Sequence, residues 1–368
     1  MQFPGSKRSL SEPFDSERRA QALERAAGAW LRRECVEATS AIRQTLEAPN
    51  WFTPPALSVA VDRAMARVNA DSLLSWAETF GRFGCPAALK VAVLNAGNVP
   101  LVGLQDFLAV MLSGHDYLGI VSRSSPYLLP AFAETARRYD SSIRCRFVTL
   151  DEAVLRADVL IATGSSATAQ LVWKRFSAAG MPRHRALLRG SRVGAAVLCG
   201  SENDEDLFRL ASDVLLHEGR GCRSVAIVLA PVGLEPDQFV EQANRFRRDF
   251  PPHGGTLLGV GRAVRLLNAV EEPFIQGDGF VLIEGDVALR EPCIVRWIRY
   301  NDESEPVAWL KRNRRFVQVV VSSGRATHII PEGIDGCRFG EGQDPPLSWC
   351  PDGVDTVAFL SDFVGVEL

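Results

Sequence analysis

The sequence has few histidines and no closely paired cysteines. Its 368 residues include five dispersed histidines and eight cysteines, none of them in a CxxC spacing. Neither a histidine-rich or CxxC-type metal site nor a compact disulfide framework is therefore expected. The chain also has no secretory signal-peptide pattern and no apolar run near the roughly 18 residues that span a membrane. We expect a reduced, cytoplasmic protein without a metal ion or an integral membrane segment.

The chain also lacks a net positive charge and several widespread nucleotide-binding and hydrolase motifs. Lys and Arg number 41 and Asp and Glu 44, a net charge of −3, so no overall field attracts nucleic acid. There is no GxxxxGK[ST], HExxH or GxSxG motif, and the GxG at Gly259 lacks the third glycine of GxGxxG. The hydrophobic fraction of 46% and the charged fraction of 23% are typical of a globular protein.

What the sequence does contain is an alternation of short apolar runs with helical segments. Helical patterns over 16–47 and 57–68 come first, and we expect these helices to pack on a core rather than to do chemistry. Later apolar runs predict strands at 89–94, 117–122, 146–150, 157–163, 195–199, 224–230, 280–284, 294–300 and 316–321. Helices between the strands indicate βαβ units and parallel sheets, whose strand-end loops gather at one edge, where ligands bind. The expected fold class is α/β.

Two loops that follow expected strands carry polar residues suited to binding. The segment NAGNVP places Asn98 at the entrance of a helix, where its amide either caps the helix or points into a cleft. Thr163, Gly164 and Ser165 join another strand to a helix. This geometry exposes backbone N–H groups to an anion such as a pyrophosphate. A capped turn without a ligand gives the same pattern.

A third segment carries a candidate nucleophile. Cys222 lies between flexible glycine-rich backbone and a new strand, and Arg220 and Arg223 flank it. Nearby guanidinium groups can lower the pKa of a thiol and expose a reactive thiolate. A buried structural cysteine is the alternative.

Taken together, the three segments resemble the aldehyde dehydrogenase superfamily, and most closely its LuxC-like fatty acyl-CoA reductases. The most specific stretch is AGNVPLVGLQDFLAVMLSGH, and ATGSSATAQ and GRGCRS follow it in the same order. The resemblance implies that Cys222 is the nucleophile and that Asn98 stabilises an oxyanion. It also implies that Thr163, Gly164 and Ser165 form the dinucleotide-binding turn.

The resemblance carries further expectations for the cofactor. Glu291 is similar to the glutamate that holds the nicotinamide ribose. Ser122, Arg123 and Ser124 stand where family members often have a lysine that binds the adenosine ribose. Because an arginine suits a 2′-phosphate, Arg123 favours NADPH, with NADH possible.

The resemblance also implies an architecture. Two Rossmann-type parallel-sheet domains are expected, with a cleft between the cofactor domain and the catalytic thiol domain. Residues 1–189 would hold the N-terminal helices and the dinucleotide-binding domain, 190–350 the cysteine domain, and 351–368 a C-terminal tail. Trp349 and Asp352-Gly353 resemble a C-terminal Trp-Asp-Gly of the LuxC-like branch, with an insertion. A homodimer is expected for this fold.

One departure from the superfamily bears on the reaction. Hydrolytic members carry a general-base glutamate upstream of the cysteine, and Leu188 stands at the matching position. An apolar side chain cannot activate water, so the acyl-enzyme should resist hydrolysis. Glu218 lies near Cys222 in sequence, and we expect it to be a solvated carboxylate at a helix end. The alternative is that Glu218 replaces the missing glutamate as the general base.

These observations lead to a functional hypothesis. The chain would take an acyl-CoA or acyl-carrier-protein thioester, form an acyl-cysteine at Cys222, and release a fatty aldehyde after hydride transfer from NADPH. An acylating aldehyde dehydrogenase would use the same residues in the opposite direction. A phosphate-activated substrate is another alternative, because Arg220 and Arg223 could bind its phosphate. A catalytically silent acyl-binding subunit that docks an acyl ligase, and an unrelated Rossmann-type binding protein, are further alternatives.

Overall fold

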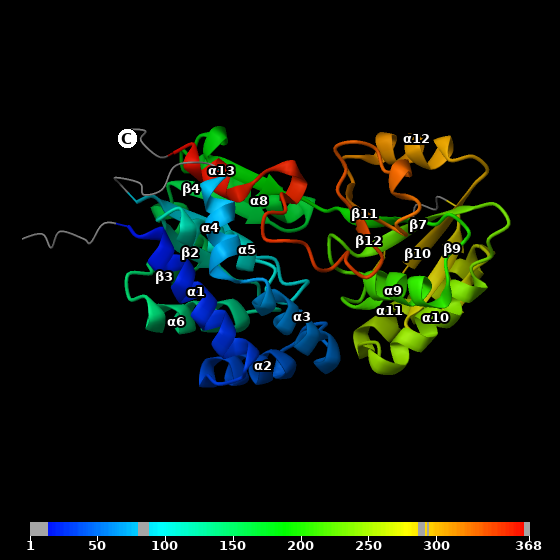
Figure 1. Ribbon diagram of the computed structural model, residues 1–368, viewed down its shortest axis with the longest axis horizontal. Coiled ribbons are helices and arrows are strands. Elements are labelled where there is room, and N and C mark those ends of the chain that lie inside the picture. The colour runs from blue at the N-terminus through cyan, green and yellow to red at the C-terminus, as the bar shows by residue number, and fades with distance from the viewer. Residues whose placement is uncertain (1–13, 80–87, 286–290, 293, 364–368) are drawn as a thin grey trace, which may run out of the picture.

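The computed structural model describes residues 14–79, 88–285, 291–292 and 294–363. Two β-sheets with helices packed on their faces form two halves that lie side by side (Figure 1). Four buried apolar clusters cover the faces of these sheets. The α/β class and the two parallel sheets are as expected from the sequence.

The first half begins with four helices: α1 (Ser16–Leu31), α2 (Val36–Glu47), α3 (Pro54–Ala66) and α4 (Ala70–Glu78). The single helical pattern expected over 16–47 is two helices, because the chain turns at Arg33, whose φ is +55°. The apolar face of α1 is buried, and its Trp30 ring meets Phe132 edge-on at 5.7 Å between centroids. These helices thus join the core on one face of the first sheet.

Sheet A has five parallel strands in the order β3-β2-β1-β4-β5. The strands are β1 (Lys90–Leu94), β2 (Asp116–Ile120), β3 (Cys145–Phe147), β4 (Val159–Thr163) and β5 (Ala186–Arg189). The helices that connect them are α5 (Leu104–Leu112), α6 (Leu128–Tyr139), α7 (Leu150–Arg156) and α8 (Ser166–Ala178). The central strands are apolar on both faces because helices cover both sides of a parallel sheet.

Sheet B has seven strands in the order β12-β11-β6-β7-β10-β9-β8. The strands are β6 (Val193–Val197), β7 (Val225–Pro231), β8 (Ile275–Gly277), β9 (Phe280–Glu284), β10 (Ile294–Tyr300), β11 (Val317–Ser322) and β12 (Gly336–Arg338). All neighbours are parallel except the β8–β9 hairpin. The accompanying helices are α9 (Asp204–Leu215), α10 (Asp237–Asp249), α11 (Gly254–Ala269) and α12 (Ser304–Asn313).

After β12 the chain returns to the first half, as the red end of the ribbon shows (Figure 1). Its last described helix, α13 (Thr356–Ser361), packs against α5. Arg189 anchors it, with one guanidinium nitrogen 2.6 Å from Asp106 and another donating to the Thr356 hydroxyl at 2.7 Å. The described part of the expected tail is therefore integrated into the core around sheet A, and residues 364–368 lie outside the described residues. The division at 190 and 351 stays a prediction.

No helix in the described ranges combines the length and the apolar character needed to cross a bilayer. The six cysteines that those ranges include are all free thiols.

Candidate active site

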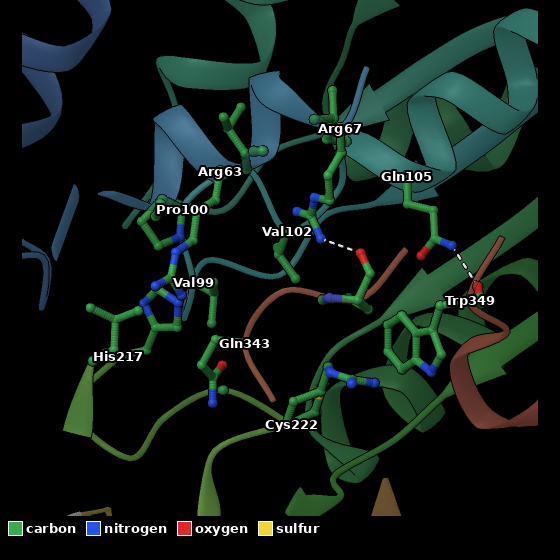
Figure 2. A pocket seen from close by; sticks show the side chains of 18 of the residues that line it. Arg63, Arg67, Val99, Pro100, Val102, Gln105, His217, Cys222, Gln343 and Trp349 are labelled. Atoms are coloured by element: carbon green, nitrogen blue, oxygen red, sulfur yellow. Dashed lines mark hydrogen bonds between the residues drawn. The ribbon is translucent and has the colours of Figure 1, made fainter. Parts of the chain in front are cut away.

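Two cavities are lined by residues of both halves and meet at Cys222. The larger cavity, about 570 Å³, lies against the loops that follow the strands of sheet A. The smaller cavity, about 130 Å³, lies between α3, the loop after β1 and the turn before β7 (Figure 2). The residues that line both cavities are Asn98, Val102, Gln105, Cys222 and Trp349. A group attached to Cys222 can therefore be approached from two sides.

Asn98 is held beside the cysteine turn by a hydrogen bond across the two halves. Its Nδ2 donates to the backbone oxygen of Arg220 at 2.7 Å, and its Oδ1 is buried with no hydrogen-bond partner in the described part of the chain. A primary amide has two N–H donors, and this bond uses one. The structure thus brings the two residues expected to be catalytic to one place, with an amide N–H still available. The helix after Asn98 begins at Leu104 rather than near Pro100.

A tight turn at the end of α9 presents Cys222. The backbone turns through positive φ at Glu218 and Gly219. The Gly221 N–H then donates to the Ser224 hydroxyl at 3.1 Å. A side chain at Gly221 would approach Ser224 and Val99 at 3.0 and 3.3 Å, so the turn fits closely against the loop after β1. The thiol is half-buried at the junction of the two cavities.

The pKa of Cys222 lies above its ordinary value. Burial is the largest cause and the Asp352 carboxylate adds to it, whereas Arg223 and Arg189 act in the opposite direction. The thiol is therefore mainly protonated at neutral pH. The expectation that flanking arginines lower the pKa of this thiol is wrong in its net direction, because the loss of solvation outweighs the charge of Arg223.

The two arginines that flank the thiol hold loops together. The guanidinium of Arg220 lies 3.3 Å from the centroid of the Trp51 ring, and that of Arg223 lies 4.5 Å from the centroid of Trp349. Arg223 also donates from Nε to the backbone oxygen of Gly342 at 2.6 Å. These contacts fix the walls on either side of Cys222.

The turn between β4 and α8 lines the larger cavity with Thr163, Gly164 and Ser165. Ser165 caps α8 by accepting from the Thr168 N–H at 3.1 Å. The Thr163 hydroxyl is buried and has no hydrogen-bond partner among the described residues. The first N–H groups of a 13-residue helix and an unpartnered hydroxyl suit the phosphates and hydroxyls of a dinucleotide. The residues of the turn therefore fit the expected cofactor.

A second loop narrows the same cavity from the side of β1 and β2. Gly97 and Ser122 both line it, and Ser124 stands behind them, donating from its hydroxyl to the backbone oxygen of Gly97 at 2.9 Å. A Cβ at Gly97 would lie 2.3 Å from the Ser122 hydroxyl oxygen and 2.2 Å from that of Ser124. Only glycine fits here, which keeps the backbone close to whatever occupies the cavity.

Three expected cofactor residues, Arg123, Ser124 and Glu291, are not among those that line either cavity. Arg123 is exposed beside Ser122, and Glu291 is exposed before β10. Glu291 and Cys222 each come three residues before one of two neighbouring parallel strands, β10 and β7. They therefore share one edge of sheet B, and the roles assigned to Arg123 and Glu291 stay predictions.

With this geometry established, sequence comparison identifies the family. Residues 20–243 match the acyl-CoA reductase (LuxC) family. The chain belongs to this family. A search of curated proteins finds no match.

Solved structures agree on the fold of this LuxC-family chain. An oxidoreductase from Marinobacter aquaeolei is 12% identical, with a TM-score of 0.71, covering 96% of this chain and 86% of that one. A succinic semialdehyde dehydrogenase from Streptococcus pyogenes, solved with NADP⁺, is 14% identical, with a TM-score of 0.68. The match covers 94% of this chain and 88% of that one. An NAD-dependent aldehyde dehydrogenase from Sinorhizobium meliloti is 12% identical, with a TM-score of 0.67. The match covers 88% of this chain and 74% of that one. The chain therefore has the aldehyde dehydrogenase fold, and its family makes it an oxidoreductase acting on acyl or aldehyde groups.

Among the described residues, no carboxylate that lines either cavity is free of an ion pair. Leu188 packs among apolar side chains of sheet A and lines neither cavity. Glu218 is 3% exposed and its carboxylate lies 2.9 Å from the Arg247 guanidinium. The expectation of a solvated Glu218 is wrong, because the end of α9 is covered by α10. Its ion pair also leaves it unsuited to act as a base.

Sequence reasoning missed two carboxylates in the wall of the larger cavity. Asp106 and Asp352 are the carboxylates that line the larger cavity in the described chain, and each is ion-paired. Asp106 pairs with Arg189, and Asp352 lies 2.8 Å from Arg192. Burial raises the pKa of Asp352, which sits at a φ of +59°. The resemblance of Trp349 and Asp352-Gly353 to a family motif was the available signal, but it did not indicate that these residues lie at the larger cavity.

Proposed function

We propose that this LuxC-family chain reduces an acyl thioester to an aldehyde through an acyl-cysteine at Cys222. The observation that carries the proposal is the position of Cys222 and Asn98, which line both cavities. The smaller cavity would receive the acyl group, and the larger one a reduced nicotinamide dinucleotide. NADPH stays the predicted form, on the strength of Arg123.

In the first half-reaction the deprotonated sulfur of Cys222 attacks the carbonyl carbon of the thioester. The carbonyl π electrons move to oxygen, where the second N–H of Asn98 and the backbone N–H of Cys222 would stabilise the charge. The carbon–sulfur bond to the leaving thiol then breaks. The proton lost by Cys222 balances the proton gained by the departing thiolate, so coenzyme A or a carrier thiol leaves neutral.

In the second half-reaction the acyl carbon must accept two electrons. A reduced nicotinamide supplies them as a hydride when it is bound. Asn98 would again stabilise the oxyanion, now on a thiohemiacetal of Cys222. Cleavage of the carbon–sulfur bond of that thiohemiacetal releases the aldehyde, and one proton from solvent restores the thiol.

The described residues around the junction offer no free carboxylate as a general base that would activate water against the acyl-cysteine. Leu188 supplies no base, and both carboxylates of the larger cavity are held in ion pairs. A residue that must first break an ion pair is a poor general base toward water. The same residues would catalyse the reverse, acylating reaction, so the net direction follows from the concentrations of thioester and aldehyde. A homodimer and an acyl-ligase partner stay predictions.

Intact-mass spectrometry tests the proposal. The protein is incubated with acyl-CoA donors of several chain lengths without nicotinamide, beside Cys222→Ala and a control, Cys35→Ala, whose thiol lines neither cavity. We expect an acyl increment on the wild type and on Cys35→Ala, lost as aldehyde when NADPH is added. An increment that persists on Cys222→Ala, or none on any protein while iodoacetamide also leaves Cys222 unmodified, would contradict covalent catalysis at this thiol.

A further inference from the structure

The smaller cavity has an unusual charge pattern. Arg63 and Arg67, one turn apart on α3 and at its C-cap, line it together with Arg223 and His217. No Asp or Glu is among its described lining residues. In Figure 2 the two α3 arginines reach in from one side, with Arg63 against His217, while Cys222 lies toward the opposite end of the view. The cavity thus gathers three guanidinium groups and no carboxylate among its described lining residues.

These guanidinium groups are incompletely satisfied. Nη1 of Arg63, Nε of Arg67 and Nη1 of Arg223 are each buried without a hydrogen-bond partner in the described chain. Arg67 has a carboxylate 3.3 Å away, on Asp344, but no ion pair forms at Arg63 among the described residues. Leaving buried cationic donors unpaired is costly unless a ligand completes them.

The neighbouring carboxylates balance only part of this positive charge. Asp344 acts on Arg67, and Asp213, which lines neither cavity, acts on Arg63 and Arg223. Burial and the charge of Arg63 lower the pKa of His217 to about 4, so the imidazole is neutral at neutral pH. Burial likewise lowers the pKa of Arg67; the Asp344 carboxylate acts in the opposite direction, and the charges of Arg223 and Arg63 add to the lowering. The arginines therefore repel one another, and an anion placed among them would be stabilised by all three.

We propose that the smaller cavity binds a carboxylate at the far end of a short acyl group, with Arg63 as its main ligand. The inference rests on the proposed function, because it takes this cavity as the acyl site. At about 130 Å³ the cavity is close to the roughly 150 Å³ that holds a benzene molecule. That volume suits a short acyl chain and is far too small for a nucleotide. The preferred donors would be ω-carboxyacyl thioesters rather than long apolar ones.

Four donors separate the acyl carboxylate from the phosphates of the leaving arm. Glutaryl and pentanoyl groups are each presented as the coenzyme A thioester and as the N-acetylcysteamine thioester, which carries no phosphate. The acylation rate of Cys222 is measured by intact mass for the wild type, for Arg63→Gln, and for Arg43→Gln as a control on an exposed helix surface. We expect Arg63→Gln to lower kcat/KM for both glutaryl donors by roughly 10- to 100-fold, the range for losing a charge-assisted hydrogen bond. Both pentanoyl donors should be unchanged.

Other outcomes overturn the assignment. If Arg63→Gln lowers kcat/KM for both coenzyme A donors but for neither N-acetylcysteamine donor, Arg63 binds the phosphates of the leaving arm and not the acyl carboxylate. An equal loss on glutaryl and pentanoyl donors would make Arg63 a structural residue. If no donor acylates the wild type, the proposed function fails, and calorimetry with free glutarate still tests the cavity. Glutarate binding that Arg63→Gln weakens would then support the anion site, and no binding by the wild type would refute it.

Discussion

The two sheets contribute to the site from opposite ends of their strands. In sheet A, the lining residues Asn98, Ser122, Gly164 and Gly190 all follow strands, at the carboxyl edge. In sheet B, Cys222 precedes β7 and so lies at the amino edge. The usual expectation for parallel sheets, that ligands bind beyond the carboxyl ends, holds for the first sheet and not for the second.

The difference follows from what each sheet provides. The carboxyl edge of sheet A offers helix N-termini, glycines and hydroxyls, which suit a phosphate-bearing ligand. The amino edge of sheet B offers a turn that is anchored by Arg223 and by the bond from Asn98 to the Arg220 oxygen. We infer that binding is a property of the sheet A side and nucleophilic attack a property of the sheet B side. Except at Asn98, which bonds across to the sheet B turn, changes on one side should therefore leave the function of the other intact.

The largest expected effect is at the thiol itself. Cys222→Ala removes the nucleophile, and we expect reductase turnover to fall by roughly 10⁴-fold or more. Binding of NADPH, followed by its fluorescence, should change little because all of its expected ligands except Glu291 lie on the sheet A side. Loss of NADPH binding together with turnover would show that the two sides are not separable.

Asn98 joins the two sides, and its removal should slow chemistry without releasing the cofactor. We expect Asn98→Ala to lower the acylation rate by roughly 10²–10³-fold, the usual effect of removing one oxyanion donor. Asn95→Ala is a matched control, because the Asn95 amide is buried and bonds to Val93 and Tyr117. That control should lower the free energy of unfolding by about 1–3 kcal/mol and spare the acylation rate of folded protein. Equal rate losses in the two variants would argue against an oxyanion role.

The raised pKa of Cys222 gives the sheet B side a pH signature. The thiolate is the attacking form, so the acylation rate should rise with pH as the thiol ionises. Below the ordinary thiol pKa of about 8.5 we expect roughly a tenfold rise per pH unit in rapid-mixing acylation assays. NADPH binding should not follow this profile. A rate that is already level near neutral pH would mean that the thiol ionises with a lowered pKa.

On the sheet A side, Gly97→Ala should disturb the cofactor alone. The new Cβ would collide with Ser122 and Ser124, so the wall of the larger cavity must shift. We expect about a tenfold rise in KM for NADPH with unchanged acylation by thioester in the absence of cofactor. Gly324→Ala, where no atom lies within 4 Å of the added Cβ, is the control. An effect on acylation as large as that on KM would contradict the division of labour.

The smallest effect is expected at Arg123, which is exposed. If it reaches the 2′-phosphate, Arg123→Ala should raise KM for NADPH by a few-fold, about the value of one exposed ion pair, and leave KM for NADH unchanged. Steady-state assays with both cofactors measure this. Equal shifts for both cofactors, or none, would remove Arg123 from the cofactor site.

Local sequence patterns were enough to find nine of the described strands, but not the short strands β5, β8 and β12. Local patterns also marked the loops that carry Asn98, Gly164 and Cys222, but the expected roles of these residues came from the resemblance to the LuxC-like reductases. The environment of each side chain could not be recognised in this way. Glu218 is covered by α10, and the pKa of Cys222 is raised by burial that no flanking residue reveals.

The smaller cavity was the main omission. The helices before sheet A were expected to serve only as packing, and Arg63 and Arg67 have the spacing of a solvated helix face. Arg67 in fact donates to the backbone oxygen of Pro345, 278 positions later in the chain. That contact exists only because the chain returns to the first half after β12, and a periodic pattern contains no information about such a return.

The central claim is that one sulfur, at the junction of two cavities, first receives the acyl group and then presents it for reduction. The acyl-enzyme is isolated from excess thioester and mixed with NADPH that carries deuterium at the transferable position. We predict one singly deuterated aldehyde for each acylated Cys222, with the free thiol regained. Release of the carboxylic acid, or of aldehyde without deuterium, would contradict direct hydride transfer to the acyl group on this cysteine.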